Sequence, residues 1–195
     1  MSIGAGGDAR PRRLFLAVFP LPDVQANVHR VTAPLRAAEG GLGVSWVRES
    51  NLHFTLRFLG DCEATVAEAA TAAMQEAASG HTPFEVRLGA LGAFPDAMRA
   101  RVLWAGLEVG EARLGSLAES LAESLERRGF PRESRPFAPH LTLGRVREPE
   151  DWSGALQRQP PLGISFDVTQ LLLVDSTLLP GGSRYGVAAR AKLAG

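Results

Sequence analysis

The sequence is poor in cysteine and in lysine. Cys62 is the single cysteine, which excludes a disulfide scaffold and a zinc site built on cysteine ligands. A lone thiol is typical of a protein from a reducing compartment. Lys192 is the single lysine. Any phosphate-binding site in this chain is therefore expected to use the planar guanidinium groups of arginine.

Long apolar runs and an excess of charge are also missing. No stretch approaches the ~20 apolar residues that a membrane-spanning helix needs. Residues 10–22, RPRRLFLAVFPLP, begin like a signal peptide, but prolines interrupt the apolar run and no small-residue cleavage site follows. We therefore expect a cytoplasmic protein with no membrane contact. The formal net charge is zero, which argues against a uniformly basic nucleic-acid surface and still permits a local basic patch.

The overall composition is that of an ordinary folded protein. Of 195 residues, 45% are hydrophobic and 22% charged, which predicts a packed core. We expect a disordered tail at residues 1–10 and one domain at residues 11–195, formed by two intertwined lobes. No glycine-rich phosphate loop of either common type is present.

The order of predicted elements indicates an α+β fold. Helices are expected at 22–40 (with a kink at Pro34), 63–79 and 111–129. Strands are expected at 13–19, 44–47, 51–60, 84–91, 100–109, 139–146, 164–178 (bent midway) and 183–193. Several consecutive strands are joined by short loops, which predicts antiparallel pairing rather than a regular βαβ array.

Two of the four histidines stand in nearly identical phrases, HFTL at 53–56 and HLTL at 140–143. Side chains alternate between the two faces of a strand. In the first phrase His53, Thr55 and Arg57 therefore share one face with Asn51. The opposite face, expected to point to the core, carries Leu52, Phe54, Leu56 and Phe58. In the second phrase His140 and Thr142 lie opposite the two leucines.

Arg145 has the wrong parity for a regular strand that carries His140. The glycine before it, Gly144, permits a bulge that would return the arginine to the histidine face. Two histidines can hold opposite protonation states near neutral pH and act as acid and base. Threonine hydroxyls and arginine suit phosphate oxygens. The pattern alone leaves two readings open, two half-sites of a phosphoryl-transfer enzyme or a chance repeat on packed strands.

The sequence segments that flank HFTL and HLTL resemble those of the two-histidine (2H) phosphoesterases. The resemblance is closest to the bacterial RNA 2′,3′-cyclic phosphodiesterases, also called 2′-5′ RNA ligases, and covers nearly the whole chain after the tail. It rests on RLFLAVFPLPD, WVRESNLHFTLRFLG, LGAFPDAMRARVLWAGL, RPFAPHLTLGRV and LLLVDSTLLPGGSRYGV, in that order.

The resemblance implies a bilobal fold in which two α+β lobes are related by a pseudo-twofold axis. Each lobe is expected to be an antiparallel sheet with helices on its outer face, and the active-site groove to lie between them. The implied activity is metal-independent hydrolysis of RNA 2′,3′-cyclic phosphate ends to 2′-phosphate ends, with reverse 2′-5′ ligation. The substrate would be RNA, for example a tRNA fragment, and no cofactor or metal is expected.

Residue roles follow from the same resemblance. We expect His53 to be the proton donor and His140 the proton acceptor, with Thr55, Thr142 and Arg145 binding the phosphate. Which histidine is acid and which is base is the open part of this assignment. Since each lobe supplies one motif and no heptad pattern appears, a monomer is expected.

Further RNA contacts are predicted less directly. Arg57 would either contact RNA or be a solvated strand charge. Arg135 belongs to a local excess of arginine at 127–147, where an RNA backbone could lie. Trp46 and Phe137 flank the motifs and would either stack on a base or pack in the core. Tyr185 has the same two alternatives.

Two rival functions remain at this stage. One keeps the 2H chemistry on 2′-5′ oligonucleotides or on a small cyclic nucleotide. The other is a nucleotide-binding module without catalysis. The presence of both histidines and both threonines argues against the second.

Overall fold

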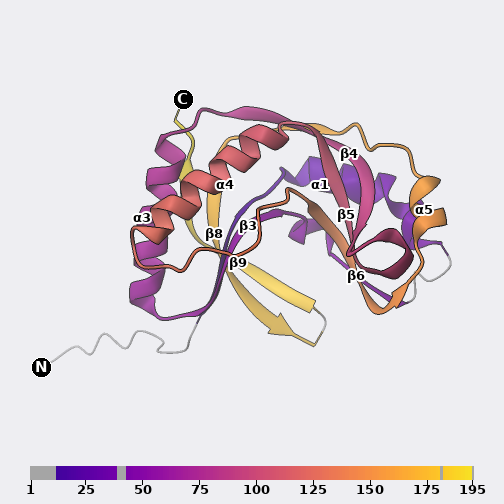
Figure 1. Ribbon diagram of the computed structural model, residues 1–195, viewed down its shortest axis with the longest axis horizontal. Coiled ribbons are helices and arrows are strands. Elements are labelled where there is room, and N and C mark those ends of the chain that lie inside the picture. The colour runs from indigo at the N-terminus through magenta and orange to yellow at the C-terminus, as the bar shows by residue number, and fades with distance from the viewer. Residues whose placement is uncertain (1–11, 39–42, 181, 195) are drawn as a thin grey trace, which may run out of the picture.

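Two antiparallel sheets form the framework of the protein (Figure 1). The computed structural model describes residues 12–38, 43–180 and 182–194, so the predicted tail at 1–10 lies outside the described residues. Each sheet carries one of the two histidine motifs. The predicted α+β class and two-lobed arrangement are confirmed.

The smaller sheet, sheet A, has four strands. Their spatial order is β3 (Phe54–Cys62), β1 (Arg12–Val18), β8 (Gln170–Leu179) and β9 (Gly182–Lys192). The larger sheet, sheet B, has the order β2 (Val44–Trp46), β6 (Leu141–Glu150), β5 (Ala100–Val109), β4 (Phe84–Phe94) and β7 (Ser165–Val168). Each sheet thus takes strands from both halves of the chain.

The segment predicted as one bent strand at 164–178 is two strands. β7 pairs with β4 in sheet B, and β8 pairs with β1 in sheet A. The chain passes from one sheet to the other at Thr169, whose carbonyl accepts a hydrogen bond from the Leu193 amide. Both strands bury apolar side chains, so the sequence pattern of one long strand continues across them. The two strands differ only in their pairing partners, which the sequence pattern does not contain.

Helices fill the connections between the strands. They are α1 (Pro22–Val31), α2 (Ala33–Arg36), α3 (Ala64–Ser79), α4 (Glu111–Glu126) and the short α5 (Ser153–Gln157). The predicted kink near Pro34 is confirmed, because α1 ends before Thr32 and α2 begins after it. α3 and α4 pack side by side, α3 against β1, β8 and β9, and α4 against β3. No helix in the described part of the chain is both long and apolar enough to cross a membrane.

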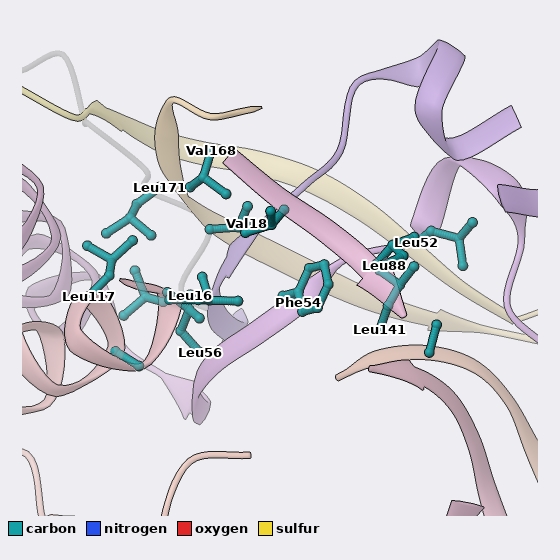
Figure 2. Packing of buried hydrophobic residues seen from close by; sticks show 14 of the residues in the cluster. Leu16, Val18, Leu52, Phe54, Leu56, Leu88, Leu117, Leu141, Val168 and Leu171 are labelled. Atoms are coloured by element: carbon teal, nitrogen blue, oxygen red, sulfur yellow. The ribbon is translucent and has the colours of Figure 1, made fainter. Parts of the chain in front are cut away.

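One continuous core joins the two sheets. Leu52 and Phe54 from the first motif lie in the same buried cluster as Leu88 and Leu141 from sheet B (Figure 2). A second, smaller cluster lies on the opposite face of sheet A. It contains Phe15, Ala17, Leu172 and Val174, with Phe19 and Tyr185 packed against it. We call this second face of sheet A the site face, because the first motif histidine packs on it.

Both motif histidines lie one residue before a strand. The predicted strand at 51–60 begins late, because residues Glu49–Asn51 form a 3-10 turn, η2, and β3 starts at Phe54. The turn is closed by backbone hydrogen bonds from Asn51 to Arg48 and from Leu52 to Glu49. His140 likewise precedes β6. Since β3 and β6 contact one another, the two motifs come together where the sheets meet.

Candidate active site

His53 is held in one orientation by the segment that leads into β3. Its Nδ1 lies 2.6 Å from the carbonyl oxygen of Asn51. A carbonyl can only accept, so Nδ1 carries the proton and donates it. In the neutral ring, Nε2 is then the nitrogen with a free lone pair, and it lies 2.9 Å from the Thr55 hydroxyl. The alternation predicted for His53 and Thr55 is confirmed by this contact.

The second motif repeats this geometry. His140 Nδ1 donates to the carbonyl oxygen of Ala138 at 2.7 Å, again two residues earlier in the chain. Its Nε2 is therefore the ring nitrogen that is available for proton transfer. Thr142 follows on β6, where it pairs across the sheet with Trp104 of β5. Each sheet therefore presents one imidazole whose Nδ1 is bound by the backbone and one threonine beside it.

Aromatic rings surround His53 on the site face. Phe19 stacks on the imidazole with ring centroids 5.0 Å apart and an interplanar angle of 15°. Phe15 lies 5.0 Å away, and Tyr185 meets the ring edge-on at 5.4 Å. Burial lowers the pKa of His53 to about 4; the hydrogen bond to Asn51 opposes that shift, and the charges of Arg145 and His140 add to it. In the free protein, His53 is neutral at pH 7.

We expect the His53 imidazole to titrate near pH 4 in the ligand-free protein, as measured by NMR of the ring protons. Phe19→Ala should raise this pKa toward the ordinary histidine value, because water then reaches the ring. Phe58→Ala is the matched control: Phe58 contacts Phe15 on the same face and has no ring contact with His53 among the described residues. An unshifted His53 pKa in the wild-type protein would contradict burial as the cause.

The same shift makes stability depend on pH. The unfolded chain binds a proton at His53 below about pH 6.5, whereas the folded protein does so only near pH 4. The contribution of neutral, buried His53 to the free energy of unfolding is therefore fully retained above pH 6.5. It is lost as the pH falls toward 4. Chemical denaturation between these two pH values should show this fall, and His53→Phe should reduce it.

A β-bulge turns Arg145 toward the histidine face, as predicted. Trp104 of β5 pairs with Thr142, but the preceding residue of β5, Leu103, pairs with Gly144, so Leu143 is an extra residue in β6. After the bulge Arg145 is exposed while its neighbour on β6 is buried. Arg145 also lies near enough to His53 for its charge to lower the histidine pKa.

Gly144 is required at this bulge for a steric reason. A Cβ added there would lie 2.6 Å from Val44 Cγ1 and 2.9 Å from Trp46 Cε3. We expect Gly144→Ala to lower the free energy of unfolding by about 1–3 kcal/mol, measured by chemical denaturation, because it overpacks the β2–β6 contact. It should also raise KM by displacing Arg145. Gly115→Ala is the control, since a Cβ at that position of α4 meets nothing within 4 Å.

The predicted face of Arg57 is wrong, and so is the burial of Phe58. Ala17 of β1 pairs with Thr55 and Leu16 pairs with Arg57, which makes Leu56 an extra residue and reverses the faces beyond it. Phe58 is 54% exposed and packs on Phe15 of the site face. Arg57 instead donates to the Pro131 carbonyl and forms an ion pair with Glu133 at 3.4 Å. Its guanidinium thus joins β3 to the segment before the second motif.

The other residues predicted to contact RNA differ in how far their side chains are buried. Trp46 packs edge-on against Trp152, 6.1 Å away, and is partly buried against the core. Phe137 is partly buried against the core, and it lines a cavity of about 280 Å³ together with the exposed Arg135. Tyr185 is half-buried on the site face, where burial raises the pKa of its hydroxyl.

Most arginines at the start of the predicted basic excess have acidic partners. Arg127 and Arg128 both bind Glu76 of α3, and Arg132 binds Glu119 and Glu126 of α4. These ion pairs hold the two helices and the following loop together. Arg135, Arg145 and Arg147 are exposed and take no part in these ion pairs, so they are cations of this stretch that an anionic ligand can reach.

Three aromatic residues of the site were missed by sequence reasoning. Phe94 meets His140 edge-on at 5.0 Å, Trp104 lies 5.1 Å from Phe94, and Phe19 stacks on His53. One signal was available for the Trp104 position: Gly92 is a glycine inside a strand, and a Cβ there would lie 2.4 Å from the indole. No group of three or more His, Cys, Asp or Glu side chains in the described residues is arranged to hold a metal ion.

Comparison with known proteins agrees with this geometry. The sequence model of the LigT-like phosphoesterases matches residues 18–104 and 107–185. The chain belongs to this family. It is similar to proteins named RNA 2′,3′-cyclic phosphodiesterase from Aquifex aeolicus, 33% identical over 94% of this chain and 98% of the relative, and from Archaeoglobus fulgidus, 39% identical over 89% and 96%. The crystal structure of E. coli LigT complexed with 3′-AMP has a TM-score of 0.75 at 28% identity, covering 94% of this chain and 98% of that one. The LigT-like fold predicted by the resemblance is thereby confirmed.

Proposed function

We propose that the protein hydrolyses RNA 2′,3′-cyclic phosphate ends to 2′-phosphate ends by acid–base catalysis without a metal ion. The observation that carries the proposal is the pair of imidazoles, each with Nδ1 bound to a backbone carbonyl and Nε2 left for proton transfer. Membership of a phosphoesterase family and the names of the relatives support the substrate class.

In this mechanism His140 accepts a proton from water as the water oxygen attacks phosphorus. The bond between phosphorus and the 3′-oxygen breaks, and His53 Nε2 donates a proton to the departing oxygen. Since burial lowers the pKa of His53 to about 4, His53 has to gain its proton as the substrate binds. The anionic phosphate favours this, because it offsets the charge of Arg145 that disfavours a second cation nearby.

Threonine and arginine side chains bind the phosphate in the same proposal. The Thr55 hydroxyl lies 2.9 Å from His53 Nε2 in the free protein. When Nε2 becomes protonated it no longer accepts a hydrogen bond, so the hydroxyl is released to donate to a phosphate oxygen. Thr142 has the matching position in the second motif, and the Arg145 guanidinium stabilises the charge that develops on phosphorus oxygens.

The substrate is proposed to be the end of an RNA chain, such as a tRNA fragment, in a cytoplasmic, monomeric enzyme. Arg135, Phe137 and Tyr185 are proposed RNA contacts, because their side chains lie beside the motifs and are at least partly accessible. The reverse reaction would join a cyclic phosphate end to a 5′-hydroxyl as a 2′-5′ linkage, with the histidine roles exchanged.

The test is an incubation with RNA that ends in a 2′,3′-cyclic phosphate, in the presence of EDTA, followed by identification of the product end. A 2′-phosphate is expected. A 3′-phosphate, or loss of activity on chelation, would overturn the mechanism. A 2′-5′-linked oligonucleotide in a parallel reaction tests the rival substrate, and the His53→Ala, His140→Ala double variant, purified identically, controls for contaminating nucleases.

A further inference from the structure

The segment that leads from α4 to β6 carries His140 without regular secondary structure. Residues 131–139 follow the last turn of α4 and end at the second motif. Within the part of the chain that the structure describes, no backbone–backbone hydrogen bond involves this stretch. The position of His140 in front of β6 therefore depends on the side-chain contacts that hold the segment.

Three prolines stiffen the same segment. Pro131 stands at its start, Pro136 in its middle and Pro139 directly before His140. A proline ring fixes its own φ angle and restricts the residue before it. A shift at the start of the segment is therefore passed on to His140 rather than absorbed between the two ends.

Arg57 of β3 holds the start of the segment. Its guanidinium donates to the Pro131 carbonyl and forms an ion pair with Glu133 at 3.4 Å. Only 11% of the Arg57 side chain is exposed, and its Nε is buried with no hydrogen-bond partner among the described residues. Because little water reaches the guanidinium, this contact constrains the segment more than an ion pair between two exposed side chains would.

Arg57 is also fixed relative to the first motif. It lies two residues after Thr55 on β3, and the Thr55 hydroxyl contacts His53. The bulge at Leu56 directs the Arg57 side chain away from the site face. Arg57 thus connects the first motif to the segment of the second motif from the side of β3 opposite the reacting groups.

We propose that Arg57 is a positioning residue, which fixes residues 131–139 against β3 and thereby sets where His140 stands relative to His53. The inference rests on the proposed function, in which the two imidazoles act on one phosphate. A displacement of about 1 Å in such a pair costs on the order of 10²-fold in rate. Since Arg57 acts through His140, its loss should lower kcat and leave KM nearly unchanged.

The test combines Arg57 variants with variants of the two histidines. Arg57→Leu should lower kcat on a cyclic phosphate RNA end by about 10–10²-fold, with KM within ~3-fold of the wild type. Arg57→Lys should recover most of the loss, because an ammonium group donates to the same oxygens. Single-turnover kinetics then repeats Arg57→Leu in the His53→Ala and His140→Ala backgrounds. The loss should persist with His53→Ala and shrink to ~2-fold or less with His140→Ala, which leaves no imidazole to position.

Arg12→Leu is the matched control. Arg12 also joins two strands, through Asp175 at 2.8 Å, but it pairs with Cys62 at the far end of β3 from the first motif. Its removal should leave kcat within ~2-fold of the wild type. If Arg57→Leu does not fold, Glu133→Ala takes its place, since the Glu133 side chain is half-exposed and only the ion pair is lost. It should show the same pattern with a loss of ~3–10-fold.

Three kinetic results would overturn the proposal. An equal loss in both histidine backgrounds would indicate a general structural role. A raised KM with unchanged kcat would indicate a direct RNA contact, and unchanged kinetics would remove Arg57 from the reaction altogether.

A measurement without turnover separates this proposal from the proposed function. Phe94 meets the His140 ring edge-on at 5.0 Å, so its ring current contributes to the chemical shifts of the His140 ring protons. Arg57→Leu should move these NMR signals and leave those of His29 in α1 in place. Unmoved His140 signals would overturn the positioning role. If the wild type cleaves no cyclic phosphate end, the proposed function fails, and moved signals still support the positioning of His140 by Arg57.

Discussion

Replacing His53 or His140 with alanine is expected to lower kcat on a cyclic phosphate RNA end by about 10²–10⁴-fold, the usual contribution of one general acid or base. Each imidazole has its Nδ1 bound to a carbonyl oxygen, so each has its Nε2 available for proton transfer. Steady-state kinetics measures the effect, with circular dichroism to confirm that each variant is folded.

His81→Ala is the matched control for these two variants. His81 binds Ser120 of α4 through its Nε2, outside both motifs, so its removal should leave kcat within about twofold of the wild type. A loss below tenfold in either motif variant would contradict proton transfer by that histidine.

The pH dependence of the residual activity distinguishes the two roles. A bell-shaped wild-type profile fits either assignment, because both need one protonated and one neutral histidine. The His140→Ala variant keeps only His53. If His53 is the acid, the residual activity falls as the pH rises through the pKa of His53 in the substrate complex; a rise instead would exchange the two roles.

Arg145→Gln is expected to lower kcat/KM by about 10²–10³-fold, the range for removal of one group that stabilises developing charge. Glutamine keeps much of the side-chain length and removes the charge and the fork of N–H donors. Arg145→Lys should recover part of the loss, because the charge returns without the bidentate geometry. Steady-state kinetics on the same RNA end measures all three proteins.

Arg101→Gln on the adjacent strand β5 is the control for this pair, because its side chain is exposed and carries the same charge. A comparable loss in Arg101→Gln would indicate a general electrostatic effect of the protein on RNA. An effect below tenfold in Arg145→Gln would remove Arg145 from the phosphate site.

Local alternation predicted the faces of the two histidine–threonine motifs well. The faces of His53 with Thr55 and of His140 with Thr142 follow from the two-residue period of a strand, and the buried leucines beside them leave one choice of face. The bulge before Arg145 was also predictable, because Gly144 marks it in the sequence. In each case the information lies within a few residues of the site.

The errors arise where the decisive contact is distant in the chain. The bulge at Leu56 that reverses Arg57 carries no glycine, and it depends on how β1 pairs with β3. The rings that bury His53 and flank His140 come from β1, β4 and β9, so they become neighbours only through the strand order of each sheet. The periodicity of a single segment contains no information about the order of the strands in a sheet.

The passage of the chain between sheets at Thr169 has a consequence for protein synthesis. While the ribosome has yet to release residues 170–192, the sheet behind the first motif consists of β1 and β3 alone. Tyr185, which contacts the His53 ring, and Leu172 and Val174, which pack in the same cluster as Phe15, have then not yet joined the site face. A nascent chain that lacks β8 and β9 therefore already carries His53 and His140, but the aromatic enclosure of His53 stays incomplete until these two strands have joined sheet A.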